Sequence, residues 1–347
     1  MSLIDTVRKP ADALGPKMTG AAATCLALDE MMAEDPDVLV LGEDVDDISG
    51  GGVFKQTKGL STKYGSDRVK STPIAEQAII GAAIGAAMAG KKPVAEIMLM
   101  NFVTVAMDMI TNHAAKLRFM SGGKTSVPLV IRMHTGAGVG TAGQHSDFLE
   151  AWMCHTPGLK VVIPSNPADQ YALLKAAIRD PNPVIFIETT MMQRAVGIGP
   201  VPGYTAEIGK ANVVKAGKDV TVIGYGRPLH DCVTVVDKLE AEGISVELID
   251  LRTIVPMDMP CVLESVARTG RAVIVHEAVT AYGVGAEIAT RLNQELFGKL
   301  KAPVERVGGA YTPVPFSKPL ERAFMWSPEK IEAAIRRTLN PTPSNEG

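Results

Sequence analysis

The stretch from Ser71 to Gly90, STPIAEQAIIGAAIGAAMAG, predicts a helix with one charged side chain, Glu76, in its first turn. Thr72 can cap this helix and Pro73 suits its start, where the missing N–H of proline costs little. No polar side chain occurs from Ile79 to Gly90, and this run is shorter than the roughly 20 residues that span a bilayer. A carboxylate in a first turn is commonly a surface partner of the helix dipole. Because the rest of the helix is apolar, we instead expect a buried core helix that holds Glu76 beside an apolar interface with a raised pKa.

The composition is that of a soluble globular protein with room for two domains. The chain has 347 residues, of which 46% are apolar and 21% charged. A net charge of −3 and the absence of Lys/Arg runs argue against a nucleic-acid partner. Four widely spaced cysteines fit neither a zinc site nor a disulfide framework, which indicates reduced thiols in a cytoplasmic compartment. Asp5 and Pro10 interrupt the apolar core that a signal peptide would need, so we expect no export and no membrane partner.

Short apolar runs that are typical of buried strands alternate with helical stretches along the chain. Val38–Leu41 is such a strand, and helices are expected from Thr19 to about Glu34 and over Pro167–Arg179. Glycine and proline interrupt the pattern between Met191 and Tyr204, and a second α/β series follows. The pattern predicts two open, mostly parallel α/β domains. We place an N-terminal arm at residues 1–18, the first domain at 19–195, a linker at 196–210, the second domain at 211–340 and a tail at 341–347.

A glycine-rich run, Gly138-Val-Gly-Thr-Ala-Gly143, matches the spacing of a dinucleotide-binding fingerprint after a strand. No helix signal follows its second glycine, and no well-placed acid stands about 20 residues further on. A loop that brings His145 to a ligand explains the glycines better, since histidine can transfer protons at neutral pH. A loop histidine is also commonly an ordinary surface residue. The glycine run leaves a single-chain nicotinamide oxidoreductase as an alternative function. A separate candidate ligand site is Gly42-Glu-Asp44, which follows a predicted strand at the kind of strand end where parallel sheets bind ligands.

Several motifs, in order along the chain, resemble one family. They are Thr72–Glu76, Gly81–Gly90, Ala114–Gly123, Gln144–Ser146, His155–Val162, Ile178–Val184, Asp250–Asp258 and Gly283–Glu287. Together they resemble the β subunit of the thiamine-diphosphate-dependent decarboxylating component of 2-oxoacid dehydrogenase complexes, a group that includes pyruvate, branched-chain and acetoin dehydrogenases. The resemblance covers about Thr19 to Leu339. It implies a transketolase-like chain, with a pyrimidine-binding domain followed by a transketolase C-terminal domain.

The resemblance also implies roles for individual residues. The family glutamate that matches Glu76 hydrogen-bonds the aminopyrimidine ring and favours the imino tautomer, which takes the proton from the thiazolium carbon. Phe102 matches the aromatic residue that packs on the pyrimidine. His145 matches a histidine near the reacting carbon that is implicated in transfer of the acyl group to lipoyl. Residues of a structural potassium site in some members match the side chains of Asp180 and Asn182 and the carbonyl groups of Leu129, Ala177 and Ile178.

The Gly-Asp-Gly motif that holds the diphosphate and magnesium in thiamine enzymes does not occur in this chain. The resemblance therefore implies an α subunit that supplies this half of the site in an α2β2 heterotetramer, and a lipoyl acyltransferase as a further partner. The apolar helix with Gly81 and Gly85 is a candidate for a subunit contact. A non-catalytic scaffold with the same fold is a third hypothesis; its signature would be loss of the glutamate, and Glu76 is present. The acyl substrate stays open between pyruvate, branched-chain 2-oxoacids and acetoin.

Overall fold

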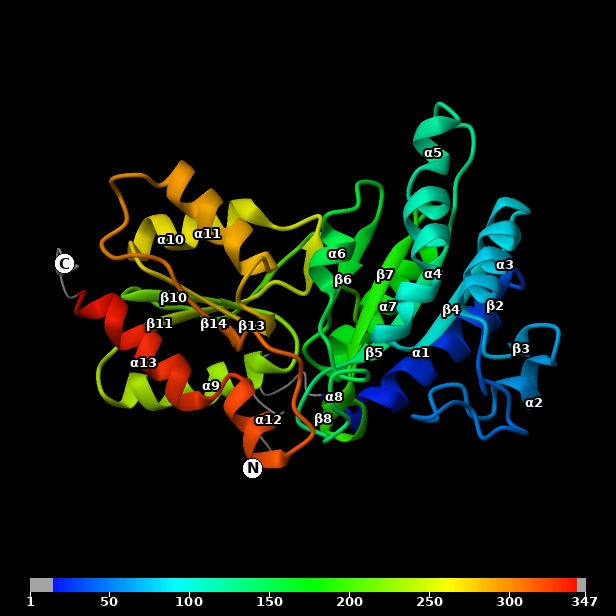
Figure 1. Ribbon diagram of the computed structural model, residues 1–347, viewed down its shortest axis with the longest axis horizontal. Coiled ribbons are helices and arrows are strands. Elements are labelled where there is room, and N and C mark those ends of the chain that lie inside the picture. The colour runs from blue at the N-terminus through cyan, green and yellow to red at the C-terminus, as the bar shows by residue number, and fades with distance from the viewer. Residues whose placement is uncertain (1–14, 342–347) are drawn as a thin grey trace.

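The computed structural model describes residues 15–341, and two mainly parallel sheets lie side by side in it (Figure 1). The first sheet has the order β12-β6-β7-β5-β4-β2-β3 and the second the order β14-β13-β10-β11-β9. All neighbours in both sheets are parallel except β12, which is antiparallel to β6, and β9, which is antiparallel to β11. The predicted fold of two open, mostly parallel α/β domains is confirmed.

The strands are mostly short runs of apolar residues. The first sheet consists of β2 (Val38–Gly42), β3 (Val69–Ser71), β4 (Lys92–Leu99), β5 (Val130–Thr135), β6 (Lys160–Val162), β7 (Val184–Thr189) and β12 (Thr253–Val255). The second sheet consists of β9 (Asn212–Lys215), β10 (Val220–Gly224), β11 (Val246–Asp250), β13 (Ala272–Val279) and β14 (Glu305–Gly309).

Helices cover both faces of the first sheet, because successive strand residues point to opposite faces. Val94 and Val130 pack in one apolar cluster with α1 (Gly20–Glu34) and α7 (Pro167–Arg179). The next residue of each strand joins another cluster, with α3 (Glu76–Met88), α4 (Val103–Asp108) and a π-helix (Met109–Ala114). α1 begins as expected, with Thr19 Oγ1 accepting a hydrogen bond from Ala22 N at 3.1 Å. The bounds of α7 agree with the prediction.

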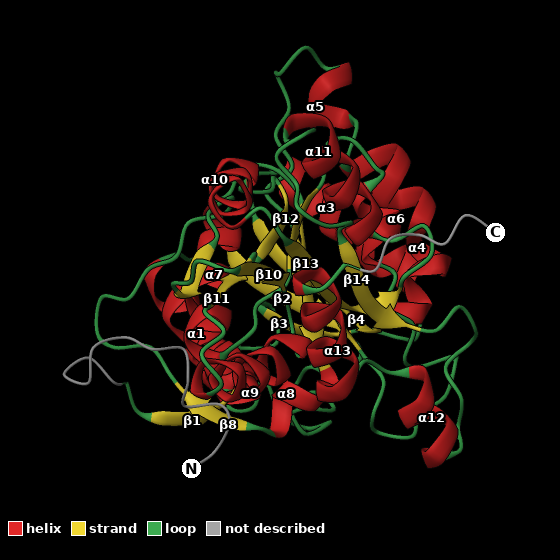
Figure 2. Ribbon diagram, turned by 90° about the vertical axis from the view of Figure 1, so that its left-hand side faces the viewer, coloured by secondary structure: helices red, strands yellow, loops and turns green. Residues whose placement is uncertain are grey.

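The second sheet is covered in the same way. Figure 1 shows α9 (Pro228–Ala241) and α13 (Pro328–Leu339) on one face and α10 (Met259–Thr269) and α11 (Val284–Glu295) on the other. The apolar cluster beneath α10 and α11 is continuous with the cluster beneath α3 and α4. The two sheets therefore share one core, and the end-on view in Figure 2 shows their helices surrounding the strands.

The sequence did not predict the short strands β1, β3, β8, β9 and β12, and three of them join parts of the chain that were expected to be separate. β1 (Lys17–Thr19) pairs with β8 (Val196–Ile198), so a strand lies at the end of the predicted loose arm and another inside the predicted linker. β12 belongs by position to the second domain, yet it pairs with β6 of the first sheet. Strands of three residues are too short to show an alternating pattern, which is why the sequence did not reveal them. The first 14 residues and residues 342–347 lie outside the described part of the chain, and the domain borders at 195 and 211 stay a prediction.

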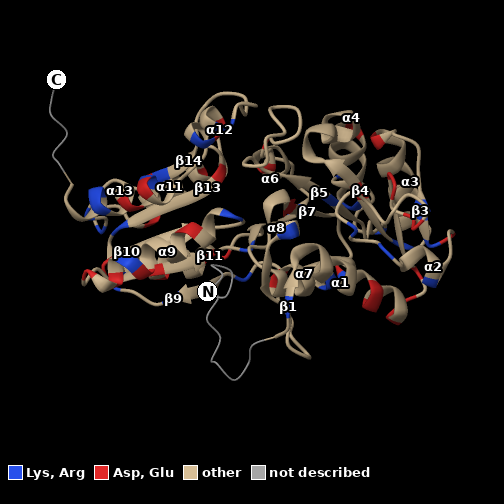
Figure 3. Ribbon diagram, turned by 90° about the horizontal axis from the view of Figure 1, so that it is seen from below, with Lys and Arg blue, Asp and Glu red and all other residues tan. Residues whose placement is uncertain are grey.

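Residues 101–119 have the apolar spacing of a helix, and the structure divides this stretch into several pieces. A 3-10 turn (Met100–Phe102) leads into α4, the π-helix and then α5 (Leu117–Met120). The other short helices are α2 (Leu60–Tyr64), α6 (Glu150–Cys154), α8 (Thr190–Arg194) and α12 (Lys318–Phe324). Within residues 15–341, no helix is long and apolar enough to cross a membrane. Figure 3 shows acidic and basic residues interspersed over both domains.

The helix that carries Glu76 begins later than expected. α3 starts at Glu76 itself, and its N-cap, Ala75, provides no side-chain hydrogen bond. Thr72 N donates to Gly42 O at 2.9 Å, which continues the pairing of β3 with β2. Thr72 and Pro73 therefore follow the sheet edge rather than the helix, and the predicted cap is wrong. The helix ends at Met88, and Gly90, with a φ of +89°, follows its C-cap Ala89 and stops the helix as expected.

The prediction that little of this helix faces water is also wrong for the chain on its own. Ile80 and Ala83 are fully buried on the side that faces β4 and α4. Ala82 and Gly85 are exposed on the other side, and Met88 keeps 52% of its surface. An exposed face without charges arises because no element of the described chain packs against it.

Candidate active site

The predicted site residues lie at the carboxyl edge of the first sheet, where parallel sheets bind ligands. The relevant strands are ordered β5-β4-β2-β3. His145 follows β5, Phe102 follows β4, Glu43 follows β2 and Glu76 follows β3. Residues that are far apart in the sequence are thus brought to one edge in the order of the strands.

Glu76 and Glu43 form an acidic pair at this edge. Both are buried, with 6% and 7% of their surface exposed. Burial, followed by the nearby charge of Glu76, raises the pKa of the Glu43 carboxyl above its ordinary value. Glu43 Oε1 has no hydrogen-bond partner, and no described residue donates a hydrogen bond to the Glu76 carboxyl. The strand-end position of Glu43 was visible in the sequence, but its partnership with Glu76 was not.

The ring of Phe102 contacts the ring of His145. Their centroids are 5.5 Å apart and their planes are inclined by 78°, an edge-to-face arrangement. Both side chains are half-buried, and Phe102 packs on the large apolar cluster that the two domains share. The structure therefore brings together two residues that the sequence named separately.

Asn101 joins the segment of Phe102 to the loop of His145. Its Nδ2 donates to Gly143 O and to Asp147 Oδ2, both at 2.8 Å, and its Oδ1 accepts from Asp147 N at 3.2 Å. Thr135 Oγ1 at the end of β5 also donates to Asp147 O at 2.6 Å. Asn101 thus binds the chain on both sides of His145, at Gly143 and Asp147, and keeps this loop next to Phe102. Sequence reasoning missed it, and the only local signal was an amide side chain directly before the aromatic residue.

The glycine run between β5 and His145 is a loop. No helix begins at Gly140, and the next helix, α6, starts only at Glu150. The strand-turn-helix geometry of a dinucleotide fingerprint is therefore missing. This contradicts the structural basis of the nicotinamide hypothesis and supports the interpretation of a loop that carries His145.

A buried ion network lies among strands β4, β5 and β7. Arg132, which is fully buried, donates to Glu96 Oε2 at 3.0 Å and to Glu188 Oε2 at 2.6 Å. Burial alone would lower the pKa of Arg132, but Glu188 and Glu96 outweigh it and raise that pKa. Burial likewise opposes the charge of Glu188, yet Arg132 keeps the pKa of Glu188 below its ordinary value.

Further polar side chains complete this network. Gln56 Nε2 donates to Glu188 Oε1 at 2.7 Å, and Gln170 Nε2 donates to the same oxygen at 2.8 Å. The ring of His134 lies 4.5 Å from that of Phe54, and burial lowers the pKa of His134. The lone charge of Arg132 in an apolar strand was the signal in the sequence that this network existed.

The residues of the predicted potassium site lie together, but their side-chain oxygens are occupied. The Asp180 carboxylate pairs with Lys160, and its Oδ1 accepts from Asn182 N at 2.9 Å. Asn182 Oδ1 accepts from Arg118 Nη1 at 2.9 Å. Leu129 O accepts from Val184 N at 2.8 Å, and Ala177 O accepts from Asp180 N at 3.2 Å. A cation here would have to be bound mainly through carbonyl oxygens, which are available at the C-terminal end of α7 near Ile178.

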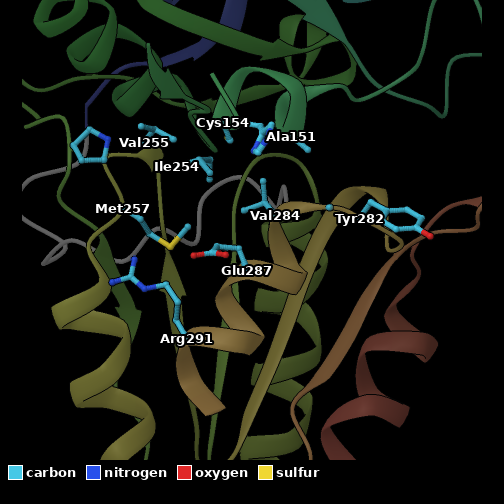
Figure 4. A pocket seen from close by; sticks show the side chains of 12 residues that line it. Ala151, Cys154, Ile254, Val255, Met257, Tyr282, Val284, Glu287 and Arg291 are labelled. Carbon is cyan, nitrogen blue, oxygen red and sulfur yellow. The ribbon is translucent and has the colours of Figure 1, made fainter. Parts of the chain in front are cut away.

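A separate pocket of about 470 Å³ lies where the two domains meet (Figure 4). Figure 4 shows Glu287 and Arg291 of α11 near Met257, with Val284 between Glu287 and Ala151 and Tyr282 farther to one side. None of the predicted catalytic or cofactor-binding residues lines this pocket. The candidate active site is instead an open edge of the first sheet.

Comparison with known proteins agrees with this geometry. Residues 16–194 match the transketolase pyrimidine-binding domain, and residues 209–331 match the transketolase C-terminal domain. The chain is 46% identical over 321 residues to the acetoin:2,6-dichlorophenolindophenol oxidoreductase subunit beta of Cupriavidus necator, covering 90% of this chain and 95% of that subunit. It is 42% identical over 313 residues to the 2-oxoisovalerate dehydrogenase subunit beta of Bacillus subtilis, covering 90% of this chain and 95% of that subunit.

Two further comparisons extend the relationship. The chain is 42% identical over 320 residues to the pyruvate dehydrogenase E1 component subunit beta of Rhizobium meliloti, covering 92% of this chain and 69% of that subunit. A solved structure described as a split gene transketolase, an inactive beta4 tetramer, superposes with a TM-score of 0.74 at 25% identity and covers 93% of this chain and 98% of its own. The chain therefore belongs to the family of transketolase-like β subunits that includes those of pyruvate, 2-oxoisovalerate and acetoin dehydrogenases.

Proposed function

We propose that this chain is the β subunit of a thiamine-diphosphate-dependent 2-oxoacid or acetoin dehydrogenase. It would cleave the substrate next to its carbonyl group and pass the acyl unit to a lipoyl group, in a site shared with an α subunit. The observation that carries the proposal is the line of Glu76, Glu43, Phe102 and His145 along one edge of the sheet. This edge provides acid, aromatic and imidazole groups, and the chain offers no motif for a diphosphate.

The residues at this edge fit the ring part of thiamine diphosphate. The buried carboxyl of Glu76 and Glu43 Oε1 receive no hydrogen bond from a described residue, so they are free to hydrogen-bond the nitrogen atoms of a bound ring. The half-buried ring of Phe102 offers a flat apolar surface beside them. Thiamine diphosphate, when bound, supplies the carbon nucleophile that attacks the substrate carbonyl.

Each residue of the chain has one task in the proposed mechanism. Glu76 would hold a proton against the pyrimidine nitrogen, with the buried carboxyl group of Glu43 beside it. Phe102 orients the ring and excludes water from one side of it. His145 lies in the loop that Asn101 binds at Gly143 and Asp147, and it would give or accept a proton when the acyl unit moves to lipoyl sulfur.

An α subunit would supply the remaining half of the site. Magnesium and the diphosphate would be bound there, and α2β2 is the proposed assembly, with a lipoyl acyltransferase as the acceptor of the acyl group. The exposed, uncharged face of α3 is the proposed subunit contact, because Ala82 and Gly85 leave room for another backbone.

Ala82→Arg should leave the isolated chain folded but reduce co-purification with its partner at least about tenfold. The matched control is Ala241→Arg at the exposed end of α9, where normal assembly is expected.

Two further features of the proposal are open to simple tests. A potassium ion at the carbonyl groups near the end of α7 would raise the melting temperature when potassium replaces sodium at constant ionic strength. An unchanged melting temperature would count against the ion. The cytoplasmic location rests on the four cysteines, all free in the structure, and cell fractionation would test it.

The decisive test is co-expression with a candidate α chain. Reduction of an artificial electron acceptor would be followed with pyruvate, 2-oxoisovalerate and acetoin, in the presence of thiamine diphosphate and magnesium. We expect turnover of one substrate class only when both chains are present, and none by this chain alone. Turnover by the isolated chain would contradict the shared site. A stable α–β complex that is silent with every substrate would favour the scaffold hypothesis.

A further inference from the structure

Two glutamates of the second domain hold the loop that carries His145. Glu321 of α12 accepts hydrogen bonds at Oε1 from Gly138 N at 2.7 Å and from Gly140 N at 3.1 Å. Glu277 of β13 accepts at Oε1 from Ala137 N at 2.7 Å. Three main-chain N–H groups at the start of the loop are thus bound by side chains that lie more than 130 residues further along the chain.

The conformation of the loop is built around these carboxyl groups. Gly136, Gly138 and Gly140 have φ values of +122°, +102° and +76°, a region that other residues rarely adopt. Backbone with such alternating conformations turns successive N–H groups toward one concave side, which suits a carboxylate. A Cβ atom at Gly136 would lie 2.7 Å from Glu277 Oε1. Close approach to Glu277 explains Gly136, crowding by Met191 and Met325 together with its positive φ explains Gly138, and the positive φ alone explains Gly140, so no nucleotide is needed to account for these glycines.

The contacts are protected from water. Glu277 and Glu321 each keep only 3% of their surface exposed. Ala137, Val314 and Phe324 form a small apolar cluster at the same place, with Val279 and Met325 packed against it. Loss of these hydrogen bonds in a buried place would leave main-chain N–H groups without partners, which is unfavourable.

The other end of the loop is fastened to the first domain by Asn101, which binds Gly143 O and Asp147. His145 lies on the turn closed by His145 N donating to Ala142 O at 3.1 Å. The loop that carries the His145 imidazole is therefore bound at its start by the second domain and at its end by Asn101, next to Phe102. We propose that Glu321 and Glu277 are positioning residues through which the second domain sets the placement of His145 for acyl transfer. This inference rests on the proposed function for its kinetic consequence, whereas the anchoring itself concerns this chain alone.

Hydrogen exchange tests the anchoring without any assumption about activity. In Glu321→Ala, the amides of residues 138–140 should exchange at least about tenfold faster than in the wild-type chain, because two N–H groups lose their acceptor. Glu247→Ala is the matched control, since Glu247 is also a buried glutamate of the second domain but binds Arg268 and Gly217 N. Equal acceleration of residues 138–140 in both variants, or none in Glu321→Ala, would overturn the proposal.

Two assays of the α–β complex test the consequence for catalysis. Glu321→Ala should lower acyl transfer to a lipoyl domain about tenfold while artificial-acceptor reduction stays within about twofold of wild type. Glu321→Gln keeps an acceptor oxygen and should restore most of the transfer rate. In the background of His145→Ala, the Glu321→Ala change should cause no further loss of transfer, because both act through one imidazole.

The exchange and transfer experiments distinguish failure of the positioning role from failure of the proposed function. Equal losses in both assays, no rescue by glutamine, or independent losses in the double variant would overturn the positioning role. If the wild-type complex transferred no acyl group from any substrate, the proposed function would fail, and the exchange experiment would still decide whether Glu321 anchors the loop.

Discussion

At the scale of single residues, the candidate site combines two buried carboxyl groups with one half-buried imidazole. Glu76 and Glu43 are both buried at the same sheet edge, and burial, followed by the nearby charge of Glu76, raises the pKa of the Glu43 carboxyl. His145 differs, because it is half-buried and rests edge-on against Phe102. The acid is thus in a dry place suited to a bound ring, and the imidazole is accessible to an incoming acyl acceptor.

Glu76→Gln should abolish nearly all turnover of the α–β complex. The amide has the same shape but cannot give or take the proton, and loss of a general acid–base group typically costs 10²–10⁴-fold in rate. We would measure artificial-acceptor reduction at saturating cofactor and substrate. Glu264→Gln, at an exposed position of α10, is the matched control and should keep normal activity. Decarboxylation at the wild-type rate by Glu76→Gln would refute the assigned role.

His145→Ala should separate the two halves of the reaction. Acyl transfer to a lipoyl domain should fall by about 10²-fold, because proton transfer at the sulfur loses its partner. Artificial-acceptor reduction does not need that step and should fall much less. The ratio of the two rates is the measurement, and an equal loss in both assays would contradict this role of His145.

At the scale of secondary-structure elements, strands β4, β5 and β7 are joined by a charged network beneath the site. Neighbouring strands place Glu96 beside Arg132 and His134 beside Glu188 in register. The sheet edge that carries the site residues therefore rests on strands whose buried charged side chains are paired with one another, while Arg132 Nε and His134 Nε2 have no hydrogen-bond partner. Such a network requires all its members, because a buried charge without its partner is strongly unfavourable.

Arg132→Met should destabilise the chain by about 3–5 kcal/mol, since it leaves Glu96 and Glu188 buried without their cation. Urea unfolding of the isolated chain, monitored by circular dichroism, would measure the decrease in the free energy of unfolding from the first unfolding transition. Arg179→Met is a suitable control: Arg179 pairs with Glu34 on the surface, where both side chains are 49% exposed. Its loss should cost less than about 1 kcal/mol. Similar costs for the two variants would show that the network contributes little.

At the scale of the whole molecule, polar contacts cross between the domains inside a shared apolar core. Ser165 Oγ donates to Asp250 Oδ1 at 2.9 Å, and Arg252 Nη1 donates to Asp169 Oδ1 at 3.1 Å. Tyr225 OH of the second domain donates to Glu150 Oε1 of α6 at 2.9 Å. Together with the glutamates that bind the glycine loop, these contacts make the placement of the second domain part of the site.

The interdomain carboxyl of Glu150 should make stability depend on pH. Burial raises its pKa from 4.5 to about 7, against the hydrogen bond from Tyr225. The unfolded chain releases this proton near pH 4.5 and the folded chain only near pH 7, so stability is lost as pH rises through this window. The loss attributable to Glu150 is on the order of 3 kcal/mol at pH 8. Cys154 and Glu277 also face this carboxyl, and the pKa of Glu277 is itself raised to about 8.

Glu150→Gln imitates the protonated acid and should remove that share of the pH dependence. The difference in melting temperature between variant and wild type should grow in favour of the variant from pH 5 to pH 8. Glu277 stays in place, so part of the decline at higher pH will persist in both proteins. A difference that does not change with pH would show that Glu150 does not titrate in this window.

Much of the fold and of the candidate site could be predicted from local sequence. The period of apolar residues and the capping residue Asn166 determine where α7 begins, and Gly90 ends α3, because these signals act within one or two turns. The apolar helix pointed to Glu76 and the glycine loop to His145, and the resemblance to a family pointed to both of them and to Phe102. The same local signals failed at Thr72 and Pro73, where pairing with Gly42 keeps the chain on the sheet edge.

What only the tertiary structure decided are the contacts between distant segments. No sequence pattern shows that Asn101 clamps the loop of His145, that Arg132 lies between Glu96 and Glu188, or that Glu321 binds Gly138 and Gly140. Local spacing determined the elements and their residues, because backbone conformation and amphipathic pattern are properties of neighbours in the chain. The partners of each buried charge depend on how the two sheets pack, and that is settled only when the whole chain folds around one core.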